Sequence, residues 1–110
     1  MEKGIEQDEL NIVSMNVILH AGNARETIMA ALDELSNQNV DFDKIEAYLK
    51  TSKQELNTAH KMQTDMIQLE ANDKAVPFSV LFIHSQDTLM TIQSELLVTE
   101  KMVNIFRKRI

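Results

Sequence analysis

The chain has 110 residues, of which 44% are apolar, and its formal net charge is −6 at pH 7. This length predicts a single domain over residues 1–110, with too much apolar content for a disordered chain. The acidic balance argues against nucleic-acid binding, and two glycines and one proline argue against an all-β fold. Without cysteine, disulfides and thiolate metal sites are excluded. No stretch resembles a signal core or a membrane span, so we expect a cytoplasmic helical protein without direct membrane insertion.

The first helix is predicted from about Asp8 to Leu35, because apolar residues recur there every three or four positions. They are Leu10, Val13, Val17, Ala21, Ala24, Ile28, Ala31 and Leu35. The polar run 36–39 ends this helix, since its side chains compete for backbone hydrogen bonds. Gly22 lies inside the helix at a cost of about 1 kcal/mol relative to Ala. Two interpretations stay open for Gly22, a tolerated defect or the close approach of another helix.

A second helix is predicted to begin after Asp41, a residue type that caps helix N-termini well. Its apolar stripe consists of Phe42, Ile45, Leu49, Leu56, Ala59, Met62, Met66 and Leu69. We expect this helix to end near Ala71, where Asn72–Lys74 begins a loop. Pro77 is predicted in the first turn of a third helix, where its missing N–H costs nothing.

The third helix carries two apolar stripes. One consists of Phe78, Phe82, Ser85, Leu89, Ile92, Leu96, Thr99, Val103, Phe106 and Ile110. The other is largely apolar at both ends and small or polar in the middle, and it consists of Val80, His84, Asp87, Thr91, Ser94, Val98, Met102 and Ile105. Since a helix in an isolated three-helix bundle needs only one apolar stripe, the second stripe is predicted to face another copy of the chain. Cyclic closure would place identical residues around one axis.

His84 and Asp87 are the main candidates for chemistry, because residues three apart project from the same face of a helix. The chain has no glycine-rich phosphate loop, no nucleophile elbow and no HExxH motif. One interpretation is a surface pair or a satisfied interfacial histidine. The other is a functional site, because polar groups on a stripe that is apolar on both sides must be paired or used.

The other two histidines, His20 and His60, fall within one or two helical turns of His84 in height. A zinc site made by the three histidines is therefore an alternative, against ordinary core or surface histidines. The seven methionines are interpreted as core filling, with a pliable docking rim as the alternative. The basic trio at residues 107–109 suits the C-terminal end of a helix.

Three segments resemble one family. The segment 84–91, HSQDTLMT, is similar to the signature H-[AGS]-Q-D-H-L-M-T of lactose/cellobiose-type enzyme IIA proteins of the bacterial sugar phosphotransferase system. The segment 21–25, AGNAR, resembles the family's AGxAR element. The segment 59–64, AHKMQT, with QLEA at 68–71, resembles its AHxxQT…EA element. The three segments follow one another in the family's order and span nearly the whole chain.

The resemblance implies an all-α, antiparallel up-down-up three-helix bundle that assembles as a homotrimer. It implies that His84 accepts a phosphoryl group from the phosphocarrier protein HPr and passes it to a cognate IIB protein. The sugar taken up would be lactose, cellobiose or a related β-glucoside. It also implies that three copies of Asp87 share one divalent metal ion near the threefold axis, which we expect to be Mg²⁺ because hard cations prefer carboxylates.

One position departs from the family pattern, because Thr88 stands where the family usually has a second histidine. Gln86, Ser85 and Thr88 are expected to support the phosphoryl group or orient the ring. Imidazole is a suitable reversible nucleophile, since its pKa near 6.5 leaves a free lone pair at neutral pH. The alternative function is a non-catalytic helical module that oligomerises through its third helix.

Overall fold

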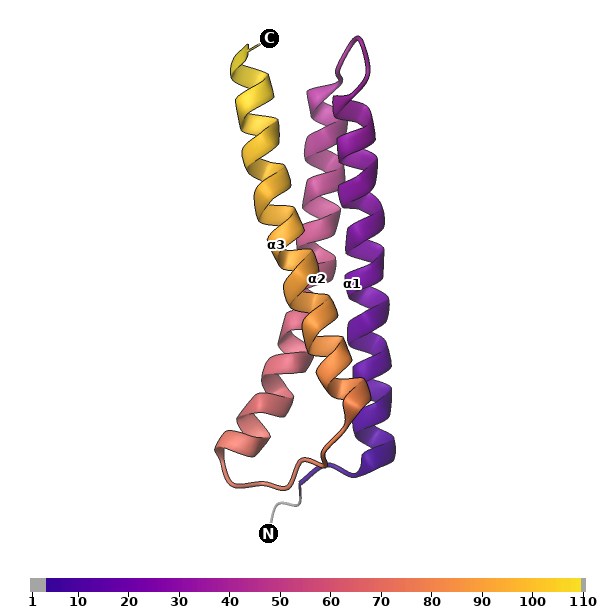
Figure 1. Ribbon diagram of the computed structural model, residues 1–110, viewed down its shortest axis with the longest axis vertical. Helices are drawn as coiled ribbons and strands as arrows, with labels where there is room; N and C mark the ends of the chain where they lie inside the picture. The colour runs from indigo at the N-terminus through magenta and orange to yellow at the C-terminus, as the bar shows by residue number, and fades with distance from the viewer. Residues whose placement is uncertain (1–3, 110) are drawn as a thin grey trace.

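The computed structural model describes residues 4–109, and within that range it contains three long helices and no strand (Figure 1). They are α1 (Gln7–Leu35), α2 (Phe42–Ala71) and α3 (Val80–Arg109). The chain runs along α1, returns in the opposite direction along α2 and then follows α3 in the direction of α1 (Figure 1). The prediction of an all-helical chain with three helices is confirmed. The predicted bounds of the first helix and the predicted end of the second agree within one residue.

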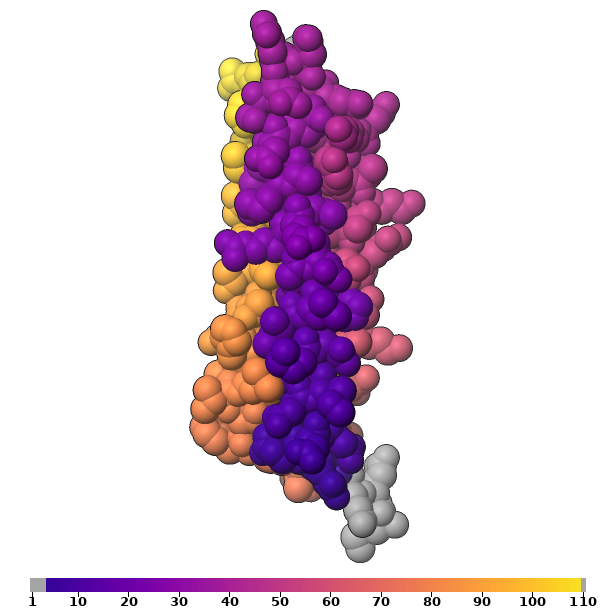
Figure 2. All heavy atoms as spheres, turned by 90° about the vertical axis from the view of Figure 1, so that its right-hand side faces the viewer, coloured from indigo at the N-terminus to yellow at the C-terminus, as the bar shows by residue number. Residues whose placement is uncertain are grey.

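The core lies where α1 packs against α2 and α3, and in Figure 2 α1 faces the viewer with α3 on its left and α2 on its right. The fully buried residues of α1 include three alanines, Ala21, Ala24 and Ala31, and these small side chains let the helices approach closely. Ser52 of α2 donates a hydrogen bond to the backbone carbonyl of Ala24 at 3.1 Å. The predicted stripe of α1 is therefore the face that packs against its neighbours.

Two cap predictions have opposite outcomes. Asp41 caps α2 as predicted, because its carboxylate accepts a hydrogen bond from the backbone N–H of Lys44 at 3.1 Å. The prediction that Pro77 lies in the first turn of α3 is wrong, since α3 begins at Val80. The nearly buried Ser79 provides the reason, because its hydroxyl accepts a hydrogen bond from the third helical residue, Phe82, at 3.0 Å.

The first stripe predicted for α3 is buried along its middle. Its buried residues are Ser85, Leu89, Ile92, Leu96, Thr99 and Val103. The prediction fails at both ends of the stripe that the structure describes. Phe78 is 81% exposed in the loop before the helix, and Phe106 is 44% exposed. Ile110 lies outside the described residues. At the end of the molecule where the chain passes from α2 to α3, the second half of α2 diverges from the start of α3 (Figure 1).

Arg107 ties the far end of α3 to α2. Its guanidinium donates to the Glu46 carboxylate at 2.7 Å and lies 4.9 Å from the centre of the Phe42 ring. The residues of the basic trio are exposed in the last turn of α3, as predicted, where positive charge complements the helix dipole.

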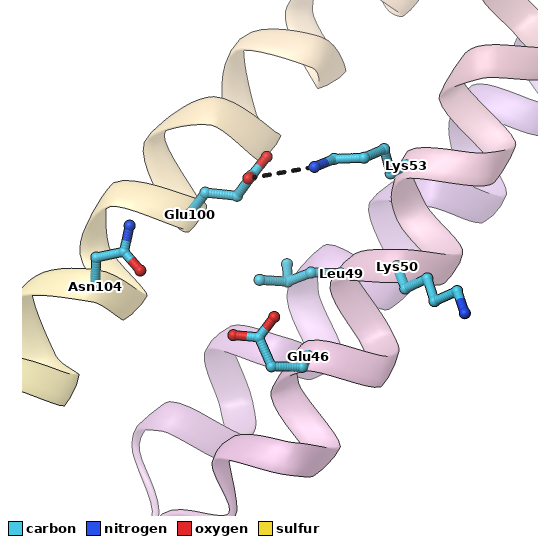
Figure 3. A pocket seen from close by; sticks show the side chains of 6 residues that line it. All are labelled: Glu46, Leu49, Lys50, Lys53, Glu100 and Asn104. Atoms are coloured by element: carbon cyan, nitrogen blue, oxygen red, sulfur yellow. Dashed lines mark ion pairs between the residues drawn. The ribbon is translucent and has the colours of Figure 1, made fainter.

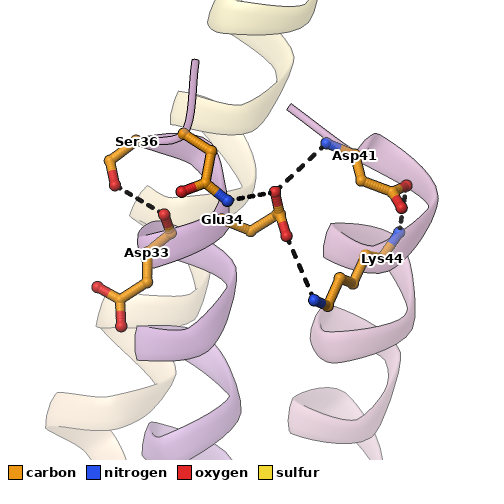
Figure 4. A network of polar contacts seen from close by, with 6 residues as sticks. Asp33, Glu34, Ser36, Asp41 and Lys44 are labelled. Carbon is orange, nitrogen blue, oxygen red and sulfur yellow. Dashed lines mark hydrogen bonds and ion pairs between the residues drawn. The ribbon is translucent and has the colours of Figure 1, made fainter. Parts of the chain in front are cut away.

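Glu34 joins the end of α1 to the start of α2 (Figure 4). Its carboxylate accepts a hydrogen bond from the Asn37 amide at 2.7 Å and lies 3.5 Å from both the backbone N–H of Asp41 and the ammonium of Lys44. The Asn37 hydrogen bond is the largest cause that lowers the pKa of Glu34 below its usual value of 4.5, and the contacts with Asp41 and Lys44 act in the same direction. The charged form of Glu34 is therefore favoured in the folded chain.

We predict that Glu34→Gln lowers the free energy of unfolding at pH 7 and weakens its dependence on acid. Because the pKa of Glu34 is lowered on folding, its contribution is fully present above about pH 4.5 and is lost as the pH falls through the folded-state pKa. Urea unfolding at pH 7 and pH 3 tests this, with the exposed Glu26→Gln as control. Equal loss of stability at the two pH values would contradict it.

Gly22 is exposed on α1, and a Cβ built on it would meet nothing within 4 Å. Close approach of a helix of the same chain is therefore wrong as an explanation for Gly22. The cost of glycine in a helix interior is not offset by any contact within the described chain.

We predict that Gly22→Ala stabilises the chain by about 1 kcal/mol, the difference in helix propensity between the two residues. The thermal midpoint should rise by roughly 4 °C. Calorimetry or circular dichroism measures the change. Destabilisation would show that another molecule approaches α1 at this point and leaves no room for a methyl group.

Candidate functional site

His84 lies in the second turn of α3, and both His84 and Asp87 are exposed. Within residues 4–109, no hydrogen bond or ion pair involves the His84 ring, and none joins it to Asp87. The ring is therefore free to meet a visiting molecule, and the spacing that suggested a pair reflects only a shared helical face.

The three predicted supporting residues occupy different environments. Ser85 is fully buried and donates its hydroxyl proton to the Phe82 carbonyl at 2.7 Å. The Thr88 hydroxyl donates a hydrogen bond to the His84 carbonyl at 2.8 Å. Gln86 is half-buried and lines a groove between α2 and the start of α3. Both hydroxyl protons are therefore used by the backbone of α3, and Thr88 would have to rotate to donate to a phosphoryl oxygen.

The second stripe predicted for α3 is exposed along its whole length, and we refer to it as the exposed stripe of α3. Its members are Val80, His84, Asp87, Thr91, Ser94, Val98, Met102 and Ile105. The apolar members lie in water to a large extent, with Val80 at 71% and Ile105 at 57% exposed. Nothing within the described chain covers this stripe. Its apolar ends would be buried only if another molecule packed against them, as the sequence pattern predicts.

A groove of about 690 Å³ runs beside this stripe between α1 and α3. Its walls are Met29, Leu32, Met90, Thr91, Ser94, Glu95, Val98, Thr99 and Met102. One carboxylate oxygen of Glu95 is buried without a hydrogen-bond partner, although the Arg25 guanidinium lies 3.4 Å away. Sequence patterning did not identify this groove, because its methionines come from two different helices.

The other two histidines contact residues other than His84. His20 of α1 lies with its Nδ1 2.5 Å from the Glu55 carboxylate of α2. The Nδ1 of His60 lies 3.4 Å from the amide nitrogen of Gln93. Among the described residues, no group of three or more His, Asp or Glu side chains is placed to hold a metal ion. The prediction of a zinc site made by the three histidines of one chain is therefore wrong.

A second hollow, of about 230 Å³, lies between α2 and α3 far from His84 (Figure 3). Lys53 and Glu100 form an ion pair across it at 3.6 Å, whereas Lys50 points away from it. Glu46, Lys50 and Lys53 are exposed and Glu100 is half-buried, and no histidine lines the hollow. The exposed imidazole of His84 is therefore the better candidate for chemistry.

Sequence comparison identifies the family. Residues 12–107 match the family model described as the PTS system, Lactose/Cellobiose specific IIA subunit. The lactose-specific EIIA component of Lacticaseibacillus casei is 30% identical over 93% of this chain and 89% of its own length. The N,N'-diacetylchitobiose-specific EIIA component of Escherichia coli K12 is 36% identical over 78% of this chain and 72% of its own.

Solved structures agree with the sequence comparison. PtcA from S. mutans superposes with a TM-score of 0.88 at 29% identity, over 94% of this chain and 99% of that one. The cellobiose-specific enzyme IIA from Bacillus anthracis gives a TM-score of 0.81 at 29% identity, over 94% and 92% of the two chains. No helix in the described part of this chain is long and apolar enough to cross a membrane. This chain belongs to the lactose/cellobiose-specific IIA family of the sugar phosphotransferase system, and it is an enzyme IIA component of that system.

Proposed function

We propose that His84 accepts a phosphoryl group from HPr and passes it to a cognate IIB protein. The observation that carries this proposal is the free, exposed imidazole of His84 inside the segment HSQDTLMT of α3. An acceptor that serves two protein partners in turn has to be reachable from outside, and His84 meets that requirement.

In the first transfer, the lone pair of one ring nitrogen of His84 attacks phosphorus, while the bond between phosphorus and the donor atom of HPr breaks. In the second transfer, a nucleophile of the IIB protein attacks the same phosphorus, and the bond between phosphorus and the His84 nitrogen breaks and returns its electron pair to the ring. The other ring nitrogen keeps its proton during the attack. Catalysis then depends on positioning and on balancing the negative charge of the phosphoryl oxygens. Because α3 contains no Lys or Arg between Val80 and Glu100, we propose that the partner proteins supply positive charge.

We propose that the active form is a homotrimer in which three α3 helices lie around one axis, with Asp87, Thr91 and Ser94 facing the axis and His84 at the seam between two protomers, where a partner protein can reach it. The side chains at the middle of the stripe, Asp87, Thr91 and Ser94, are small enough for close approach, and the apolar residues at both ends would lose water. The methionine-lined groove between α1 and α3 offers an adaptable surface beside the axis.

A metal ion fits this assembly better than it fits one chain. The single chain contributes one exposed carboxylate at this height of α3, Asp87, and three such groups around an axis would repel one another. Carboxylate oxygens are ligands that Mg²⁺ prefers. We propose that the three Asp87 carboxylates hold one Mg²⁺ per trimer, which would offset two of their three negative charges.

For the sugar, we propose lactose, cellobiose or a related β-glucoside. Relatives of this chain carry names specific for lactose, for oligo-β-mannosides and for N,N'-diacetylchitobiose. A phosphocarrier exchanges a phosphoryl group with other proteins and need not touch the sugar, so none of its residues is assigned to sugar recognition.

We predict that His84→Ala abolishes phosphorylation and keeps the fold, because the His84 ring makes no hydrogen bond in the described structure. The protein is incubated with phosphoenolpyruvate, enzyme I and HPr, and intact mass is measured before and after acid treatment. Wild type should gain one acid-labile phosphoryl group. His20→Ala and His60→Ala are the matched controls and should gain it as well.

Retained phosphorylation of His84→Ala would move the acceptor to another residue. If wild type gains no mass while a known IIA protein does so with the same reagents, the alternative of a non-catalytic oligomerisation module would replace the phosphocarrier proposal.

We predict that Asp87→Leu abolishes Mg²⁺ binding and keeps, or strengthens, the trimer, because it removes three repelling carboxylates from the axis. Analytical ultracentrifugation and metal analysis of the purified protein give the two readouts. Asp65→Leu, a similar change at an exposed position of α2, should alter neither. Monomers formed by Asp87→Leu would contradict an axial position of Asp87.

A further inference from the structure

We propose that Gly4 and Ile5 clamp the loop between α2 and α3, and that Gly4 is thereby a positioning residue for phosphoryl exchange at His84. This inference rests on the proposed phosphocarrier function for its kinetic consequences. The clamp itself can be tested without activity.

The clamp consists of backbone groups from distant parts of the sequence. The backbone N–H of Ile5 donates to the carbonyl of Ala75 at 2.9 Å. A Cβ on Gly4 would lie 2.6 Å from the carbonyl carbon of Ala75 and still closer to its oxygen. Because these are backbone atoms, no side-chain rotation can relieve the collision, and any residue other than glycine must push the segment or the loop away.

The loop depends on this clamp because its middle has no other backbone hydrogen bond within the described residues. Its beginning is fixed by Lys74, whose N–H donates to the Leu69 carbonyl at 2.9 Å after the left-handed Asp73, at φ 61°. Its end is fixed by the Ser79 cap of α3. Between these points, residues 75–78 have only the Ile5 hydrogen bond to the carbonyl of Ala75.

Packing beneath the loop does not replace the clamp. A groove of about 290 Å³ separates the end of α2 from the loop and the start of α3, with Met66, Ile67 and Glu70 on one side and Val76, Phe78 and Ile83 on the other. This is also where α2 diverges from α3 (Figure 1). Val76 and Pro77 are half-buried, but α2 leaves this space open, and the Ile5 hydrogen bond is the backbone contact that holds the middle of the loop.

A displaced loop would affect His84 through the start of α3. Ser79 ends the loop and caps the helix, and His84 follows it by five residues, which is about one and a half helical turns. The exposed Phe78 and Val80 lie on the same short stretch. A protein partner that docks around His84 meets these residues as one surface, whereas a small phosphoryl donor meets the imidazole alone.

The test compares Gly4→Ala and Gly4→Val with Gly22→Ala in the full chain. Gly22 is the matched control, because a methyl group there meets nothing within 4 Å. Hydrogen exchange of the Ile5 amide, which donates to the Ala75 carbonyl, and of the Phe82 amide, which donates to the Ser79 hydroxyl at the end of the loop, reports the clamp without activity. We expect faster exchange in both Gly4 variants, more so in Gly4→Val, and unchanged exchange at these amides in Gly22→Ala.

The kinetic arm uses two phosphoryl donors. With phosphorylated HPr below saturation, the rate for Gly4→Val should fall roughly tenfold, since small displacements near reacting groups have effects of that size or larger. With the small donor phosphoramidate, the rate of phosphorylation should stay within about twofold of wild type, because the imidazole is intact.

Three results would overturn the inference. Wild-type exchange in Gly4→Val would show that no clamp exists. Wild-type kinetics with HPr would show that the clamp does not position the docking surface. A parallel fall with both donors would show a general structural defect. Failure of wild type to accept phosphate from HPr would instead count against the proposed function, and the exchange experiment would still decide whether the clamp exists.

Discussion

The structure depends on which face of α3 packs against the other two helices and which face remains in water. One stripe of α3 packs against α1 and α2 and is buried from Ser85 to Val103. The exposed stripe of α3 holds His84 and Asp87 between exposed apolar residues. Burial of the first stripe fixes the rotation of α3 about its axis, and this rotation places the imidazole outside the core. The exposure of the candidate nucleophile is thus a consequence of core packing.

This division is consistent with the acceptor role that we propose for His84, which needs few partners from its own chain. The backbone of α3 uses the hydroxyl protons of Ser85 and Thr88, and the His84 ring has no hydrogen-bond partner within the described residues. Phosphoryl transfer requires positioning and charge balance more than covalent chemistry from the protein. A rigid helix supplies the position, and the absence of Lys and Arg from this part of α3 leaves charge balance to whatever docks there.

Much of the fold could be predicted from the sequence, because the helices are long and their apolar residues recur at regular intervals. Asp41 as a cap and the buried positions of α1 follow from local rules that the fold does not override. The start of α3 was mispredicted because Pro77 and Ser79 are both good helix starters, and only the structure shows which one the chain uses. The groove between α1 and α3 and the contact of Gly4 with Ala75 join residues far apart in sequence, so no local pattern reveals them.

The identity of the phosphorylated atom tests the role of His84 most directly. Protein labelled with ¹⁵N in its imidazole rings can be followed by NMR while phosphoenolpyruvate, enzyme I and HPr are added. We expect one ring nitrogen of His84 to shift and to show coupling to phosphorus, while the signals of His20 and His60 stay in place. Phosphorus bound to either of those two rings, or to no histidine of a folded protein, would contradict the role assigned to His84.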